Sequence, residues 1–121
     1  MSRRHDAERW GARAESIAAW WLRLKGWRVL ARRFRTPMGE IDLIAARRNV
    51  LAIIEVKARD EIDAALDAVH ARSRQRIERA AEAFMAGHQH WSKFSPRFDV
   101  MIIRPWRLPR HLRDAWRPDW R

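Results

Sequence analysis

Two carboxylates stand inside strongly apolar segments of the first half of the chain: Asp42 in the run 40–46 and Glu55 in the run 50–58. Each run predicts a strand, and the three residues between them are too few for anything except an antiparallel hairpin. With the turn centred between residues 48 and 49, Asp42 and Glu55 become direct cross-strand neighbours, with Cβ atoms about 4.5–5.5 Å apart. Because two carboxylates at that spacing repel each other, the sequence predicts a partner that offsets their charge.

A divalent cation would offset it. Mg²⁺ takes one or two carboxylates, keeps several waters and uses substrate phosphate oxygens for the rest of its octahedron. Lys57 projects on the same face as Glu55, roughly 6.6 Å further along, while Ile54 and Val56 turn to the opposite, core face. Such a lysine positions an attacking water or stabilises charge on a phosphoryl transition state. The alternative is a set of charged residues on a solvated strand face.

Periodicity and turn signals predict the surrounding elements. A helix is expected over residues 6–25, because apolar residues recur there at steps of three and four and Gly26 follows. Its stripe consists of Trp10, Ala14, Ile17, Trp21 and Leu24. Strands are expected at 27–35 and 96–104 beside the hairpin, with a turn at 36–39. The order helix, three strands, helix, strand predicts an α/β fold with a mixed central sheet flanked by helices.

The second helix is expected over residues 63–87. Its apolar face is marked by Leu66, Val69, Ile77, Ala80, Ala81 and Phe84. The composition changes at Pro105, which divides the chain into a domain of residues 1–104 and an Arg/Trp/Pro-rich tail of residues 105–121.

The chain is strongly basic and lacks cysteine. Its 121 residues include 26 Lys+Arg and 15 Asp+Glu, a net charge of +11, with 47% hydrophobic residues. That content is typical of a folded domain rather than a disordered polycation. The expected partners are polyanions, nucleic acid first and an anionic membrane surface second. The alternative is biased residue usage, because 23 of the 26 basic residues are Arg.

No apolar stretch approaches the roughly 18 residues of a membrane span. The N-terminus runs into a helix-period pattern rather than the apolar core of a signal peptide. We therefore expect a cytoplasmic location. The absence of cysteine excludes disulfides, thiolate zinc sites and cysteine nucleophiles, and it fits a reducing compartment.

Three motifs together resemble a known family: residues 39–44 (GEIDLI), 54–59 (IEVKAR) and 97–100 (RFDV). They look like the YraN-like family of uncharacterised bacterial proteins, in the PD-(D/E)xK, restriction-endonuclease-like nuclease superfamily, over residues 11–103. The resemblance implies an αβββαβ core that hydrolyses phosphodiesters with Mg²⁺, for which Mn²⁺ can substitute. It implies that Asp42 and Glu55 are metal ligands and that Lys57 is the catalytic lysine.

Two further positions match the family. Glu15 matches a glutamate of the first helix and is assigned to the catalytic set, either as a second metal ligand or as a residue that orients the ligands. The alternative is an ordinary boundary glutamate. On a helical wheel Glu15 is bordered by Ala12, Ala18, Ala19 and Leu22, an edge that can pack close to a sheet. Gln75 matches a recurrent position and is expected to contact a phosphate or a base, with an exposed helical glutamine as the alternative.

Two basic segments point to nucleic acid independently. The first, expected to contact phosphates, consists of Arg28, Arg32, Arg33 and Arg35. The second runs from Arg104 to the end of the tail and holds six arginines and three tryptophans, which suit backbone contact plus stacking on unpaired bases. The alternatives are a disordered end and a segment that wraps the domain. The wrap is favoured because exposed Trp is costly, with residues 111–116 as one helical turn.

The leading hypothesis is a Mg²⁺-dependent endonuclease that acts on DNA, including branched or structured DNA, without a small-molecule cofactor. The rival is a nucleic-acid-binding accessory protein that keeps the fold and has no catalytic activity. Peripheral membrane association through the tail ranks behind both. The sequence leaves DNA versus RNA and the oligomeric state open. A homodimer is one arrangement, because symmetric cuts on two strands need two active sites.

Overall fold

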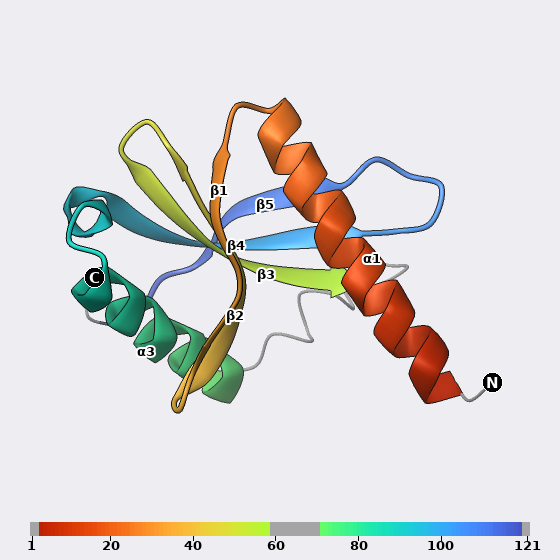
Figure 1. The fold of residues 1–121 in the computed structure, drawn as a ribbon, viewed down its shortest axis with the longest axis horizontal. Coiled ribbons are helices and arrows are strands. Elements are labelled where there is room, and N and C mark those ends of the chain that lie inside the picture. The colour runs from red at the N-terminus through yellow and green to blue at the C-terminus, as the bar shows by residue number, and fades with distance from the viewer. Residues whose placement is uncertain (1–2, 59–70, 120–121) are drawn as a thin grey trace.

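A five-stranded sheet lies between two helices in the computed structural model, which describes residues 3–58 and 71–119 (Figure 1). The helices are α1 (Arg3–Leu24) and α3 (Ala71–Gly87), and a short 3₁₀ helix, η1, spans Trp91–Lys93. The strands are β1 (Arg28–Thr36), β2 (Gly39–Arg47), β3 (Val50–Ala58), β4 (Ser95–Ile103) and β5 (Arg110–Trp116). The elements α1, β1, β2, β3, α3 and β4 form the αβββαβ core expected from the sequence.

The strands follow one another across the sheet in chain order, and only β3 and β4 are parallel. Parallel neighbours need a long crossover connection. The segment between β3 and β4 contains α3, which packs on the sheet through contacts with β2 and β1. The other helix, α1, contacts β3, β1, β2 and β4. The sheet is therefore mixed and flanked by helices, as the sequence predicts.

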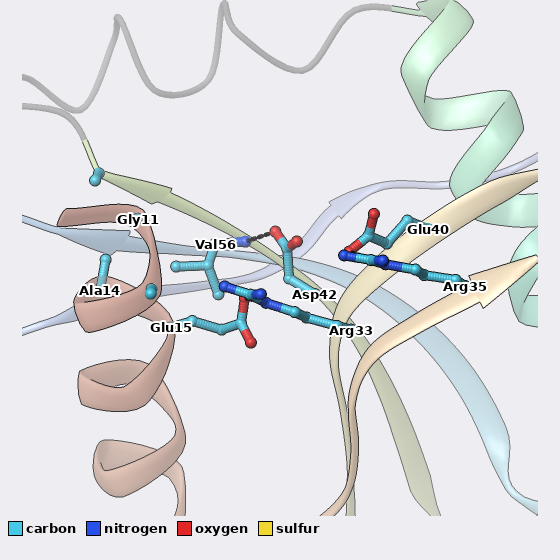
Figure 2. Close-up of a pocket in the computed structure, with 10 residues that line it drawn as sticks. Gly11, Ala14, Glu15, Arg33, Arg35, Glu40, Asp42 and Val56 are labelled. Atoms are coloured by element: carbon cyan, nitrogen blue, oxygen red, sulfur yellow. Dashed lines mark hydrogen bonds and ion pairs between the residues drawn. The ribbon is translucent and has the colours of Figure 1, made fainter. Parts of the chain in front are cut away.

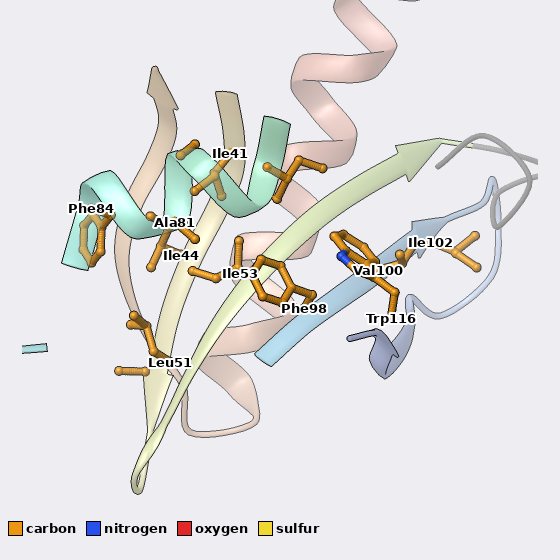
Figure 3. Close-up of a cluster of buried hydrophobic side chains, with 13 residues drawn as sticks. Ile41, Ile44, Leu51, Ile53, Ala81, Phe84, Phe98, Val100, Ile102 and Trp116 are labelled. Atoms are coloured by element: carbon orange, nitrogen blue, oxygen red, sulfur yellow. The ribbon is translucent and has the colours of Figure 1, made fainter. Parts of the chain in front are cut away.

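Two apolar clusters fill the space between the sheet and the helices. Figure 3 shows the cluster under α3, where Ala81 and Phe84 meet the sheet. Ile77 belongs to the same cluster. In β3, Ile53 belongs to this cluster whereas Ile54 belongs to the cluster under α1. Both faces of β3 are thus buried, which explains why its sequence is continuously apolar before Glu55.

The buried edge of α1 differs from the predicted stripe. Leu24 is 72% exposed, and Trp10, Ile17 and Trp21 are only partly buried. The buried residues are Ala14, Glu15, Ala18, Ala19 and Leu22. The stripe prediction was therefore wrong: the edge of α1 that packs on the sheet is the one next to the predicted stripe. Small side chains on that edge let the helix approach the sheet closely, while the larger aromatic residues lie at the boundary. The prediction that the edge around Glu15 packs on a sheet is confirmed.

Residues 111–116, expected as one helical turn, belong instead to β5, which pairs antiparallel with β4. This correction has a backbone cause, because β4 would otherwise present an open edge of unpaired N–H and C=O groups. The expectation that the tail wraps the domain is confirmed for Trp116, which is 7% exposed. Its Nε1 donates a hydrogen bond to Glu78 on α3 at 2.9 Å.

The second helix is described from Ala71 onward, so the predicted positions Leu66 and Val69 lie outside the described residues. Within α3 the expected apolar face is confirmed, because Ile77, Ala80, Ala81 and Phe84 are all buried. The start of α3 lies against the start of β2: a Cβ atom at Gly39 would lie 2.5 Å from the backbone oxygen of Arg76. Gly39 is therefore needed for this close approach.

Candidate active site

Asp42 lies where the β2–β3 ladder ends. The register expected from the hairpin is confirmed from Arg47↔Val50 to Leu43↔Ile54, which is the last pair. One residue beyond it, Oδ2 of Asp42 accepts a hydrogen bond from the backbone N–H of Val56 at 2.8 Å (Figure 2). Asp42 and Glu55 are therefore not a ladder pair as predicted. Instead, the Asp42 carboxylate accepts a hydrogen bond from a backbone N–H that needs an acceptor where the two strands separate.

The two carboxyl groups nevertheless meet. They are in hydrogen-bonding contact, and each acts electrostatically on the other. Burial, reinforced by the negative charge of Asp42, raises the pKa of Glu55 to about 7. Burial also raises the pKa of Asp42, and the nearby charge of Glu15 adds to this, while the Val56 N–H acts in the opposite direction. The pair thus concentrates negative charge in a poorly solvated place, the condition in which a cation binds strongly.

Lys57 lies beside this pair, as the strand alternation predicts. Its Nζ is 3.2 Å from Oε1 of Glu55, and the two side chains are only 20% and 16% exposed. The positive charge of Lys57 acts to lower the pKa of both carboxyl groups, yet both values stay raised. One ammonium group therefore does not neutralise the two carboxylates.

A cavity of about 640 Å³ opens beside Asp42, between the middle of α1 and the strands β1, β2 and β3 (Figure 2). Its charged lining residues are Glu15, Arg33, Arg35, Glu40 and Asp42. Arg33 has φ 53°, in the left-handed region that non-glycine residues rarely occupy. Strained backbone of this kind is typical of functional sites, and here it lies in the strand that borders the cavity.

Glu15 faces this cavity from α1 and is 7% exposed. Its Oε2 lies 3.2 Å from Nε of Arg33, and its Oε1 lies 3.7 Å from Nε of Arg32. Among the described residues, no three His, Cys, Asp or Glu side chains are grouped closely enough to hold a metal ion. In this conformation Glu15 is paired with two guanidinium groups, and the candidate metal ligands are Asp42 and Glu55.

The four arginines expected to bind phosphates separate into two groups. Arg32, Arg33 and Arg35 lie near the cavity, and Arg35 reaches Glu40 at 3.5 Å. Arg28 is at the other end of β1, opposite Ala46, roughly 23 Å from Arg35 along the strand. Its guanidinium lies 5.3 Å from the ring centroid of Trp91.

Gln75 lies outside the cavity around Asp42. Its side chain is exposed on α3, and it lines a separate, smaller cavity together with Trp116 and Arg117. The structure therefore places Glu15 and Asp42 around one cavity with Arg33 and Arg35. Glu55 and Lys57 adjoin Asp42, Arg32 adjoins Glu15, and Arg28 and Gln75 lie elsewhere.

A second buried carboxylate was not assigned a role from the sequence. Asp99 in β4 is 0% exposed and receives hydrogen bonds from Arg97 at 2.9 Å, from His111 at 2.7 Å and from the Asp114 backbone N–H at 2.9 Å. Burial alone would raise the pKa of Asp99, but the bonds from His111 and Arg97 outweigh it and hold the pKa below the usual value. The sequence feature that could have indicated the role of Asp99 was its position between two apolar strand residues, Phe98 and Val100.

The residues present fit a hard divalent cation. Two carboxylates are the number that Mg²⁺ takes when phosphate oxygens and waters supply the remaining ligands. The carboxylates of Asp42 and Glu55 are already in contact, and their mutual repulsion would be relieved by a cation between them. Asp42 is further fixed by the Val56 N–H. The donor set consists of oxygens, as Mg²⁺ and Mn²⁺ prefer.

An αβββαβ core with a mixed sheet defines a restriction-endonuclease-like fold. The chain belongs to the uncharacterised protein family UPF0102, whose model matches residues 14–103. This is the YraN-like family that the sequence motifs resemble, so that expectation is confirmed.

Several relatives are similar over most of their length. The UPF0102 protein of Parvibaculum lavamentivorans is 54% identical over 112 residues, which cover 93% of this chain and 84% of the relative. The UPF0102 protein of Paramagnetospirillum magneticum is 46% identical over 123 residues, which cover 98% of this chain and 95% of the relative. That of Bartonella bacilliformis is 52% identical over 102 residues, 84% of each chain.

None of the described helices is both long and apolar enough to cross a membrane.

Proposed function

We propose that this protein is a Mg²⁺-dependent endonuclease that hydrolyses phosphodiester bonds of DNA, including branched or structured DNA. The observation that carries the proposal is the contact between the partly buried carboxyl groups of Asp42 and Glu55, with Lys57 paired to Glu55. Two poorly solvated carboxylates in contact lower the stability of the fold, so a function is needed to account for them. Asp42 lines an open cavity together with Arg33 and Arg35, which supports a role of the pair in binding a metal and a phosphate.

Each residue has a distinct role in this proposal. Asp42 and Glu55 would hold Mg²⁺, which when bound polarises the phosphate and lowers the pKa of a coordinated water. The Val56 N–H keeps Asp42 oriented toward Glu55. Lys57 is held close to the ligands by Glu55 and places a positive charge where the phosphate gains negative charge during attack. The protein thereby contributes orientation and electrostatic stabilisation.

The arginines near the cavity would hold the DNA backbone. Arg35 is the most accessible, with 70% of its side chain exposed, and Arg32 and Arg33 are 42% and 48% exposed. Guanidinium groups bind phosphates in a planar, two-pronged geometry. Since Glu15 pairs with Arg32 and Arg33, it would set where these groups lie relative to Asp42.

A second candidate is a nucleic-acid-binding accessory protein with no catalytic activity. The observation that favours it is the pairing of Glu15 with arginines, which leaves two carboxylates for the metal. The two candidates differ in one measurable property. An accessory protein binds DNA but does not cleave it, so it shows no cleavage that depends on Asp42 and Glu55.

The test is cleavage of a labelled panel of duplex, single-stranded, flap, four-way-junction and RNA substrates with Mg²⁺ or Mn²⁺. The wild type is compared with the double variant Asp42→Asn/Glu55→Gln, purified identically. Glu40→Gln is the matched control, because Glu40 lines the same cavity but its side chain is 44% exposed. We expect cutting by the wild type and by Glu40→Gln, and none by the double variant. Binding without cutting on every substrate would contradict the nuclease and support the accessory protein.

A further inference from the structure

A second cavity, of about 740 Å³, lies on α1 beside the loop between β4 and β5. Trp10, Arg13 and Ile17 line it from α1, and residues 103–108 line it from the end of β4 and the following loop. Trp106 in this loop is fully exposed, at 103%, and Leu108 is 72% exposed. The cavity therefore combines apolar walls with an aromatic ring that the fold leaves in water.

Trp106 is also held in an unfavourable backbone conformation. Its φ is 60°, in the left-handed region, which is a clear outlier for a bulky aromatic residue. By contrast, Trp116 in β5 is 7% exposed and hydrogen-bonded to Glu78, so it contributes to the core. A strained and solvated tryptophan does not stabilise the domain in this way, and outliers of this kind cluster at binding sites.

The cavity around Trp106 lies at the same end of the sheet as the cavity around Asp42. Ala58 lines the first cavity and Ile103 lines the second, and these two residues are register partners in β3 and β4. On α1, Gly11 and Ala12 line the first cavity while Trp10 and Arg13 line the second. The two cavities are therefore on two flanks of one helix, whose diameter is about 10 Å. About three nucleotides of a stacked strand span that distance.

The charges around Trp106 are all positive. Arg13, Arg104 and Arg107 line the cavity, and none of the described residues that line it is acidic. An exposed aromatic ring for base stacking, with arginines for the adjacent phosphates, is the combination used to bind single-stranded nucleic acid. Stacking requires an unpaired base, because bases in a duplex already have both faces covered.

We propose that Trp106, with Arg13, Arg104 and Arg107, forms a binding subsite for an unpaired nucleobase and its flanking phosphates. This inference rests on the proposed function, because the subsite would direct the single-stranded part of a branched or frayed substrate past the metal site. It names the substrate class of the enzyme: DNA with an unpaired segment next to the bond that is cut.

The test measures binding in EDTA, where no cleavage occurs, by fluorescence anisotropy. A labelled single-stranded oligonucleotide is compared with a blunt duplex of the same length. Trp106→Ala is expected to weaken single-strand binding roughly fivefold to a hundredfold, the range measured for loss of one stacked base. Trp106→Phe keeps most of the affinity. Blunt-duplex binding changes less than twofold.

Trp20→Ala is the matched control. Trp20 is an exposed tryptophan on α1, at 65%, and it lies outside the lining of this cavity. Its substitution is expected to leave single-strand binding unchanged. Because Trp106 is fully exposed, Trp106→Ala should also unfold at the wild-type temperature, which a thermal melt checks. Equal losses for the two alanine variants, or equal losses for duplex and single strand, would overturn the subsite.

The phosphate contacts have their own readout. Arg104→Gln and Arg107→Gln should each reduce the slope of log affinity against log salt by about 0.7 for a single strand. Unchanged slopes would remove these residues from the subsite.

A membrane surface is the competing occupant. Binding to vesicles of anionic phospholipid that Trp106→Ala abolishes, with oligonucleotide binding unaffected, would overturn the nucleobase assignment.

Failure of the subsite and failure of the nuclease give different results. Cleavage that needs Asp42 and Glu55 but is the same in Trp106→Ala on flap and single-stranded substrates overturns the subsite alone. Single-strand binding lost in Trp106→Ala, with no cleavage of any substrate in either metal, supports the subsite and contradicts the nuclease.

Discussion

The carboxylate of Asp42 accepts the backbone N–H of Val56 at 2.8 Å, one residue beyond the last pair of the β2–β3 ladder. A side chain thus links the two strands where their backbones separate. Because Val56 directly follows Glu55 in β3, this hydrogen bond holds Asp42 beside Glu55. The candidate site is therefore built into rigid strands, which position functional groups more accurately than loops do.

Glu55→Gln is expected to stabilise the fold at pH 8 by up to about 3 kcal/mol, since each pKa unit corresponds to about 1.4 kcal/mol. The variant removes a partly buried carboxyl whose pKa is raised from 4.5 to about 7. Between these two values the native state holds a proton that the unfolded chain has lost, so wild-type stability falls as pH rises through this range. Urea unfolding in EDTA at pH 5 and pH 8 measures the difference, which should be much smaller at pH 5 and vanish only below the unfolded pKa of 4.5.

Mg²⁺ provides the control for this prediction. Added at pH 8, it should raise the stability of the wild type and have little effect on Glu55→Gln, because a ligand stabilises only the state that binds it. Equal stabilisation of both proteins, or a wild-type stability that does not change between pH 5 and pH 8, would contradict the assignment of Glu55 as a metal ligand with a raised pKa.

Lys57→Met is expected to reduce kcat roughly 10²- to 10³-fold, the usual loss when one charge-stabilising group is removed. DNA affinity in EDTA should stay within about twofold of the wild-type value, because Lys57 is only 20% exposed and is paired with Glu55. Lys57→Arg should recover little, since the planar guanidinium cannot replace a compact ammonium there. Parallel losses of binding and cleavage would instead assign Lys57 to the DNA backbone.

Glu15→Gln separates two roles for this glutamate. If Glu15 mainly positions Arg32 and Arg33, the substitution leaves Mg²⁺ affinity nearly unchanged and strengthens DNA binding at low salt, because two guanidinium groups lose their partner. We expect this result. A fall in Mg²⁺ affinity of about 10- to 100-fold, measured by calorimetry, would instead show that Glu15 binds or orients the metal.

Asp99→Ala is expected to reduce the free energy of unfolding by about 3–5 kcal/mol, because Arg97 and His111 would lose a buried partner. The pKa of Asp99 lies below its usual value, so this carboxylate stabilises the fold above its unfolded pKa of 3.8 and the contribution is lost as pH falls further. Denaturant unfolding at pH 7 and pH 3 checks both effects. Asp119→Ala, at an exposed position in the C-terminal tail, should change little.

Mg²⁺ affinity gives the counter-test for Asp99. Asp99 does not line the cavity beside Asp42, so Asp99→Ala should bind Mg²⁺ as the wild type does wherever it remains folded. A loss of metal binding without a loss of stability would contradict this structural role.

The order of helices and strands follows from local pattern. The apolar runs around Asp42 and Glu55 set two strands, and the short turn at Arg48, with φ 56°, sets their register. The placement of Lys57 on the same strand face as Glu55 follows from strand alternation alone. These features depend on residues close in sequence, so they could be predicted, and the candidate metal ligands were found because a charge inside an apolar strand is conspicuous.

The sequence by itself therefore determined the αβββαβ order, the hairpin register and the placement of Lys57 on the same face as Glu55. Only the tertiary structure decided which edge of α1 packs on the sheet, since two adjacent edges share the same period and the fit to the sheet selects the small residues. It also decided that residues 111–116 form a strand on the edge of β4 and that Glu15 pairs with Arg32 and Arg33. Each of these outcomes depends on partners distant in the chain, which no local pattern specifies.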